Sequence, residues 1–131
     1  MKELRGFFRN EYETYFKLGN LYQGNPDYSY FSLKTEELAK QKLKFVLILD
    51  HKKMCFSICL SGQNKSIRKK YWQMFKGSDW NNYHLAESIE ESLSIVDQTI
   101  VENPDFGNRR MLTDQIETAS LNVINDMREL R

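Results

Sequence analysis

Two apolar segments separated by four polar residues constrain the fold of this chain most strongly. The first, 43–49 (LKFVLIL), is almost continuously apolar, as is a β-strand covered on both faces. In the second, 54–60 (MCFSICL), large apolar residues alternate with Cys and Ser, the pattern of a strand with one buried face. The short polar connection between them favours an antiparallel hairpin over residues 43–60.

The two cysteines of the chain both lie in the second of these strands. Four strand steps place the Cα atoms of Cys55 and Cys59 about 13 Å apart, whereas a disulfide spans at most about 7 Å. The two side chains can therefore neither bridge each other nor chelate one metal ion together. We expect free, buried or half-buried thiols, which fit a reducing cytosol.

Helices are predicted on both sides of the hairpin from the spacing of apolar residues and from cap residues. Thr35 and Asn64 are N-cap residues, and Ser88 with Glu91 forms a capping box. The predicted helices cover residues 3–18, 35–42, 65–76, 88–102 and about 112 to the C-terminus. Between the first two, residues 19–33 are expected to form an ordered loop with a short extended piece near 28–33.

These elements predict an α+β fold. A small antiparallel sheet, made of the hairpin 43–60 and a possible short third strand near 83–86, packs with four or five helices. With 131 residues, of which 40% are hydrophobic and 28% charged, the chain is expected to form one globular domain over 1–131. The N-terminus is charged and no apolar run approaches about 20 residues, so we expect a soluble cytoplasmic protein without a membrane segment.

Charge is distributed unevenly along the chain, although the net charge is only +1. Residues 1–77 hold 15 Lys or Arg and 7 Asp or Glu, a net +8, whereas residues 78–131 hold 4 and 11, a net −7. Two interpretations remain open. The basic residues can form a polyanion-binding face, or the basic helix can pack beside the acidic predicted helix and be neutralised within the fold.

The predicted helix 65–76 is the candidate anion-binding element. Its free N–H groups and its cations can hold a phosphate or a carboxylate. The residues expected to do so are Asn64, Lys65, Arg68, Lys69 and Lys70. The turn 61–66 (SGQNKS) resembles the end of a phosphate loop, but it lacks both glycines of that motif, which argues against a nucleoside triphosphatase.

Binding of nucleic acid would also need exposed rings on which bases can stack. Candidates near the basic helix are Trp72, Trp80 and Tyr83. Trp72 lies beside the apolar stripe of its helix, so a position in the core or at its rim is the alternative.

The first third of the chain is rich in aromatic residues. Two interpretations are open: the rings form the main core against the hairpin, or some of them line a cleft or a dimer contact. Nine of these residues are Phe7, Phe8, Tyr12, Tyr15, Phe16, Tyr22, Tyr28, Tyr30 and Phe31.

The segment 42–77 (KLKFVLILDHKKMCFSICLSGQNKSIRKKYWQMFKG) has a particular order of features: an apolar strand, an Asp-His turn, an alternating strand and a basic helix. In this it resembles an uncharacterised family of short bacterial domains, and the C-terminal pattern ENPDF…LTDQIE…LNVI fits the same family. The resemblance implies a small bacterial protein without an established activity, and it supplies no catalytic residues.

The function is therefore not determined by the sequence. The leading hypothesis is a non-enzymatic binding or interaction module, with a homodimer as one form; a polyanion or nucleic-acid binder using helix 65–76 is the first alternative. A thiol- or histidine-dependent enzyme, using a cysteine with His51 or His84, is the second. No motif for a cofactor, a metal ion or acyl transfer occurs.

Overall fold

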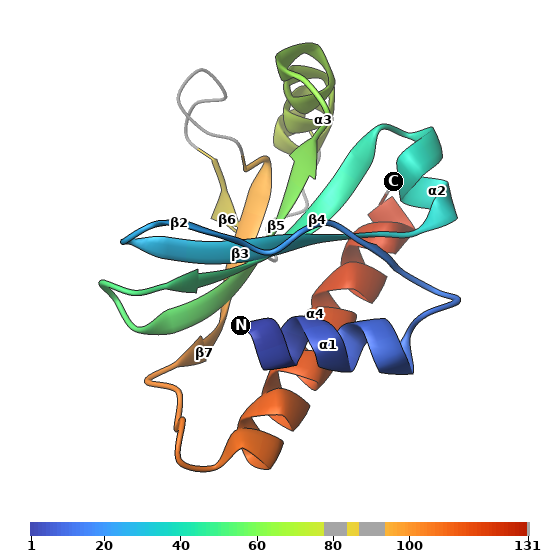
Figure 1. Cartoon of the computed structure of the whole chain (residues 1–131). Helices are drawn as coiled ribbons and strands as arrows, with labels where there is room; N and C mark the ends of the chain where they lie inside the picture. Colours follow the sequence, from blue (N-terminus) through green and yellow to red (C-terminus); the bar gives the residue numbers. More distant parts are fainter. Residues whose placement is uncertain (78–83, 87–93, 131) are drawn as a thin grey trace.

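The chain folds around an antiparallel β-sheet that carries helices at its faces and ends (Figure 1). The computed structural model describes residues 1–77, 84–86 and 94–130. Within them the strands are β1 (Lys17–Leu18), β2 (Tyr22–Asn25), β3 (Tyr28–Lys34), β4 (Leu43–Asp50), β5 (Cys55–Gly62), β6 (His84–Leu85) and β7 (Val96–Glu102). The helices are α1 (Lys2–Glu11), α2 (Glu36–Lys40), α3 (Lys65–Gly77) and α4 (Arg109–Leu130).

The sheet is larger than the sequence predicts. Its strands follow the order β1-β3-β4-β5-β7-β6, β2 also pairs with β3, and every pairing is antiparallel. The prediction of a small sheet, a hairpin with one short extra strand among four or five helices, is therefore wrong. The fold is still α+β, but a seven-stranded sheet dominates the described residues and four helices accompany it.

One predicted helix is in fact a strand. Residues 96–102 form β7, which lies between β5 and β6. The spacing of Val96 and Ile100 fits a helix, but the segment VDQTIVE is rich in β-branched residues, which pack well on a pleated sheet. The Ser88–Glu91 capping box lies outside the described residues.

The aromatic N-terminal segment also differs from its prediction. Helix α1 ends at Glu11 instead of continuing to residue 18, and a turn follows in which the N–H of Phe16 donates to the carbonyl of Tyr12. Phe16 is nevertheless buried, because the turn places its ring against that of Phe8. The predicted loop 19–33 contains two strands, β2 and β3, of which β3 confirms the expected extended piece.

The central hairpin and three helix assignments are confirmed. β4 and β5 pair over their full length, from Leu43 opposite Gly62 to Asp50 opposite Cys55. The hydroxyl of Thr35 accepts the N–H of Leu38 at the start of α2. The other two confirmed helices are α3 and the C-terminal α4, and β6 occupies part of the expected third strand.

The core lies between the sheet and helices α1, α2 and α4. Figure 1 shows α1 and α4 on one side of the sheet, whereas α3 projects from the end of β5 toward the other side. We call the covered side the inner face and the opposite side the outer face. Buried inner-face residues are Phe31, Leu33, Phe45, Leu47, Phe56, Ile58 and Leu60, and the helices add Leu4, Phe8, Leu38, Ile116, Val123, Ile124 and Met127.

Candidate functional site

A row of three lysines crosses the outer face of the sheet. Lys17 on β1 lies directly opposite Lys34 on β3. The register that pairs Leu33 with Phe45 places Lys44 of β4 beside Lys34, and Lys44 in turn lies opposite Ser61 of β5. We call Lys17, Lys34 and Lys44 the lysine row. Within the described residues none of the three forms an ion pair.

The predicted anion-binding helix adjoins one end of this row. Gly62 follows Ser61, and a Cβ at Gly62 would lie 3.1 Å from the side chain of Arg68, so α3 packs closely on the end of β5. Asn64 acts as the predicted cap, because its side-chain oxygen accepts the N–H of Ile67 at 3.0 Å. Lys69 is exposed, as are Lys65 and Lys70.

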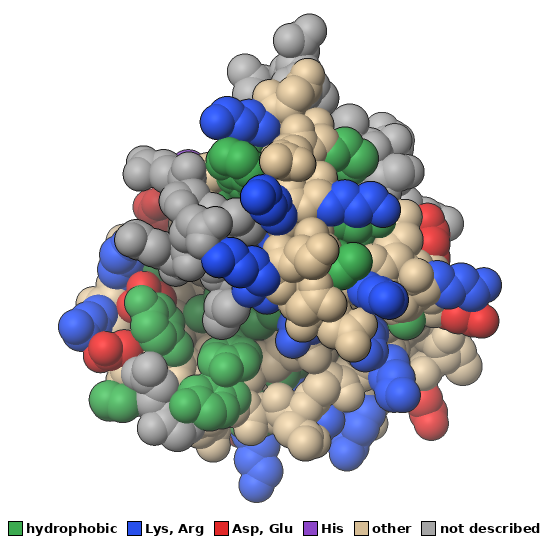
Figure 2. All heavy atoms as spheres, turned by 90° about the horizontal axis from the view of Figure 1, so that it is seen from above, with side chains coloured by type: hydrophobic (Ala, Val, Ile, Leu, Met, Phe, Trp, Pro, Cys, Tyr) green, Lys and Arg blue, Asp and Glu red, His purple; other side chains and the backbone are tan. Residues whose placement is uncertain are grey.

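Lys and Arg side chains therefore gather from two directions. Figure 2 looks onto the outer face and shows them across its centre and right, with carboxylates toward the left and right margins and an apolar group toward the lower left. The Nε atom of Arg68 is buried without a hydrogen-bond partner in the described part of the chain. The sequence indicated the cations of α3, whose role in anion binding stays a prediction, and it did not indicate the lysine row.

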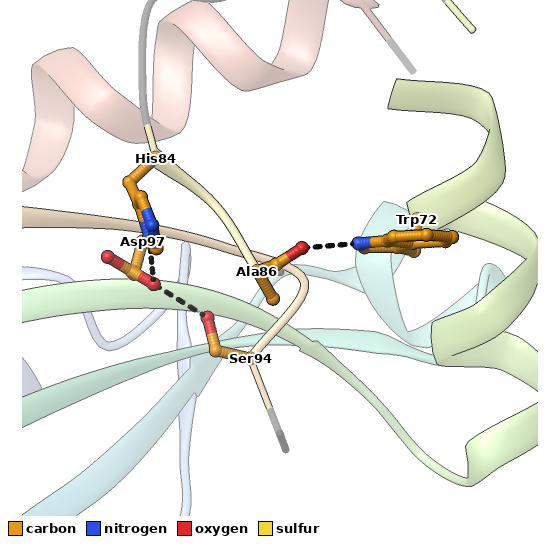
Figure 3. Close-up of polar contacts among 5 residues, drawn as sticks. All are labelled: Trp72, His84, Ala86, Ser94 and Asp97. Carbon is orange, nitrogen blue, oxygen red and sulfur yellow. Dashed lines mark hydrogen bonds and ion pairs between the residues drawn. The ribbon is translucent and has the colours of Figure 1, made fainter. Parts of the chain in front are cut away.

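Trp72 braces α3 against the segment that follows β6. Its indole N–H donates to the carbonyl of Ala86 at 2.6 Å (Figure 3), and the half-buried ring packs against the core. The Lys76 ammonium lies 4.6 Å from the centre of the same ring, a cation–π contact. Trp80 and Tyr83, the other two predicted stacking residues, lie outside the described residues.

A polar cluster lies at the β6 edge of the sheet. His84 and Ser94 both contact the same carboxylate oxygen of Asp97, at 3.2 Å and 3.5 Å (Figure 3). In a hydrolytic triad the histidine lies between the hydroxyl and the carboxylate, whereas here the carboxylate lies between the other two groups. This cluster therefore ties β6 to β7 and does not activate the serine.

Neither thiol is prepared for nucleophilic attack. Burial raises the pKa of the Cys59 thiol to about 12, and the carboxylate of Asp97 acts in the same direction. Burial also raises the pKa of Cys55 above its usual value. Both thiols therefore stay protonated near neutral pH. They react weakly, because the thiolate is the reactive form. Both cysteines are free, as the sequence predicts.

His51 has a partner that the sequence did not indicate. Its Nε2 atom lies 2.8 Å from the hydroxyl of buried Ser29, and its backbone N–H donates to the carbonyl of Asp27. These contacts fasten the β4–β5 turn to the start of β3.

Among the described residues no three His, Cys, Asp or Glu side chains converge on a possible metal position. None of the described helices has the length and the apolar composition of a membrane-spanning helix.

Comparison with known proteins gives a family without an assigned activity. No curated protein and no solved structure matches the chain. One family, described as a domain of unknown function (DUF7000), matches residues 1–131 and so extends over the sheet and all four described helices. This agrees with the uncharacterised family that the sequence resembles, and the chain belongs to the DUF7000 family.

Proposed function

We propose that this domain is a non-enzymatic binding module that holds an extended polyanion on the outer face of its sheet. The observation that carries the proposal is the lysine row, three cations in register on β1, β3 and β4 without an acidic partner in the described residues. Cations on α3 lengthen the same surface, and a reducing cytosol suits the two free thiols.

The usual structural role of lysine in a sheet does not account for this arrangement. Lysines on edge strands discourage pairing with other chains, which explains Lys17 on the edge strand β1. Lys34 and Lys44 lie on strands that are paired on both sides. Like charges directly opposite each other destabilise a sheet. A polyanion would neutralise this repulsion, and sites that break a local rule in this way are often functional.

A depression beside Lys17 limits where a ligand can lie on the outer face. This depression of about 470 Å³ is lined by Lys17 and Lys34 and also by the acidic residues Glu13 and Glu36. Neither carboxylate forms an ion pair with the lysines. The acids limit the basic surface on that side, so the expected path of the ligand runs over β3 and β4 toward α3.

The test compares matched charge removals on the two sides of the molecule. The variant Lys34→Gln/Lys44→Gln removes two cations of the lysine row, whereas Lys2→Gln/Arg110→Gln removes two exposed cations from α1 and α4. Binding of fluorescein-labelled heparin and of a labelled 20-nucleotide dT strand is followed by fluorescence anisotropy over a salt series. Each phosphate contact in a single strand contributes about 0.7 to the slope of log K against log salt.

We expect the wild type and the control variant to bind equally, and the lysine-row variant to bind more weakly, with a dT salt slope smaller by about 1.4. Circular dichroism melting checks that both variants fold. Absence of binding to both polyanions at 50 mM salt refutes the proposal. Equal weakening by the control variant also refutes it, because net charge alone would then explain the effect.

A further inference from the structure

Three exposed tyrosines share the outer face with the lysine row. Tyr28 and Tyr30 alternate on β3 with Ser29 and Phe31, which point into the core, so the two phenol rings project from the outer face. Tyr22 on β2 lies opposite Tyr30. The exposed fractions of Tyr22, Tyr28 and Tyr30 are 44%, 43% and 37%, high values for large rings on a sheet.

Two of these rings form one platform. The centres of Tyr22 and Tyr30 are 4.8 Å apart with 31° between the ring planes. Neither hydroxyl has a hydrogen-bond partner among the described residues. Tyr12 shows the structural alternative, since it is half-buried and its hydroxyl donates to the carboxylate of Glu117. The hydroxyls of the platform therefore make no hydrogen bond that stabilises the described part of the fold, and the two rings remain exposed.

Only small residues lie on the outer face between the tyrosine platform and Lys34. Along β3, Tyr30 and Lys34 are four residues apart, which is about 13 Å, and Ser32 lies between them on the same face. Its neighbour on the adjoining segment is Gly19, whose N–H donates to the carbonyl of Ser32 at 2.9 Å. A Cβ at Gly19 would lie 2.2 Å from the Ser32 hydroxyl oxygen, so only glycine leaves this floor undisturbed.

We propose that the polyanion is single-stranded nucleic acid, with its phosphates on the lysine row and α3 and at least one base stacked on the Tyr22–Tyr30 platform. This inference rests on the proposed function and specifies its ligand. Stacking on aromatic rings combined with a cationic track is how proteins hold single strands without sequence preference. The tyrosine platform and the lysine row supply these two elements on one face, because both project from the outer side of β3.

Other polyanions use only half of this surface. A sulfated sugar or polyphosphate has no planar base, so it cannot stack a base on Tyr30. A duplex keeps its bases stacked inside and also cannot place one on an exposed ring. The ligand class is therefore tested by removing the bases while the charges stay, and by removing the rings while the lysines stay.

The first experiment uses three labelled ligands of the same sequence length: a 20-nucleotide dT strand, an abasic strand with the same phosphates, and the dT strand paired with dA. For the wild type we expect the dT strand to bind at least fivefold more tightly than the abasic strand or the duplex. Equal affinity for the dT and abasic strands overturns the inference but leaves polyanion binding intact. No binding of any ligand overturns the proposed function as well.

The second experiment uses Tyr22→Leu/Tyr30→Leu, with Phe106→Leu as the control. Phe106 has a ring that is 46% exposed, but it packs beside Phe56 of the inner face. Base stacking contributes enough for a 5- to roughly 150-fold loss in dT affinity in the tyrosine variant, with unchanged affinity for the abasic strand. A loss that is equal for both strands contradicts stacking and indicates a folding or charge effect.

A photocrosslink supplies a readout that does not depend on affinity. A dT strand carrying single 5-iodouracil substitutions is irradiated with the wild-type protein, and the linked peptides are identified by mass spectrometry. We expect crosslinks in the peptides that contain Tyr22 or Tyr30. Crosslinks confined to other peptides place the bases elsewhere and refute the platform.

Discussion

The ring of Phe8 packs α1 against Phe31 of the sheet, so its removal tests directly whether α1 covers the inner face. Phe8 is fully buried, and its ring centre lies 5.6 to 6.5 Å from those of Phe7, Tyr12, Phe16 and Phe31. Truncation of a buried phenylalanine to alanine costs about 3–5 kcal/mol. Because the remaining rings come from a helix, a turn and a strand, they cannot all move to fill the cavity. We expect Phe8→Ala to lie near the upper end, about 4 kcal/mol.

The assay is urea unfolding followed by circular dichroism, with thermal melting as a second measurement. A loss of about 4 kcal/mol corresponds to a decrease in Tm of roughly 15 °C for a chain of this size. Phe8→Leu keeps most of the volume, and we expect it to cost about 1–1.5 kcal/mol. Phe106→Ala, which removes a half-exposed ring, should cost less than about 1 kcal/mol. If Phe8→Ala costs no more than Phe106→Ala, α1 does not cover the sheet as described.

Two further predictions concern single groups. Folding raises the pKa of the Cys59 thiol from 9.0 to about 12, because the buried site favours the neutral form. The thiol therefore contributes fully to the free energy of unfolding below pH 9, and this contribution is lost as the pH rises toward 12. The difference is about 4 kcal/mol at the top of this window. Urea unfolding at pH 8 and pH 11 should show a smaller alkaline loss in Cys59→Val than in wild type, and equal losses would contradict burial of the thiol. Thr35→Ala should cost about 1 kcal/mol in the same assay, because it removes the acceptor for the Leu38 N–H, whereas Thr35→Ser should cost less; equal costs would show that the hydroxyl does not cap α2.

The sequence predicted elements whose local pattern and cap residues agree. The 43–60 hairpin is such a case, because its alternation and its short turn both favour paired strands. The helices α2 and α3 begin where Thr35 and Asn64 offer a side-chain oxygen to a free N–H. In each case the deciding interactions join residues that are close in the chain, so the sequence contains them directly.

β7 could not be predicted in the same way. Its residues satisfy a helical spacing and a strand composition equally well, and the choice is made by partners far along the chain. β7 is paired on one side with β5, from Leu60 opposite Val96 to Cys55 opposite Glu102, and on its other side with β6. The packing of Val96 and Val101 in the core adds to this tertiary preference.

The candidate site divides along the same line. The cations of α3 lie within one short segment of the sequence, 65–76, so the sequence predicts them as a group. The lysine row comes from three strands, and it exists only because the sheet register aligns Lys17, Lys34 and Lys44. No spacing within one segment could have shown it. The same holds for the Tyr22–Tyr30 platform, which requires β2 to pair with β3.

The sheet converts the uneven charge of the sequence into a spatial separation. β5 carries no charged residue and lies between the lysine row and Asp97 on β7. The pKa of Cys59 on β5 reflects charges on both sides of the strand, because the carboxylate of Asp97 raises it and the ammonium of Lys44 lowers it. Lys44 lies opposite Ser61 and Asp97 lies opposite Cys59. Two strand spacings and a two-residue offset along the strands therefore separate their Cα atoms by about 12 Å, which exceeds the screening length of about 8 Å at physiological salt.

The described acids of β7 therefore do not neutralise the lysine row. Asp97 is instead engaged by His84 and Ser94 at the far edge of the sheet. The polyanion proposed for the outer face would be attracted to the lysine row and repelled by Asp97 on β7 and by Asp50, which lies opposite Tyr28 at the other end of β4 from Lys44. The proposed ligand would therefore pass over Lys34 on β3 and Lys44 on β4, with the ring of Tyr30 four residues further along β3.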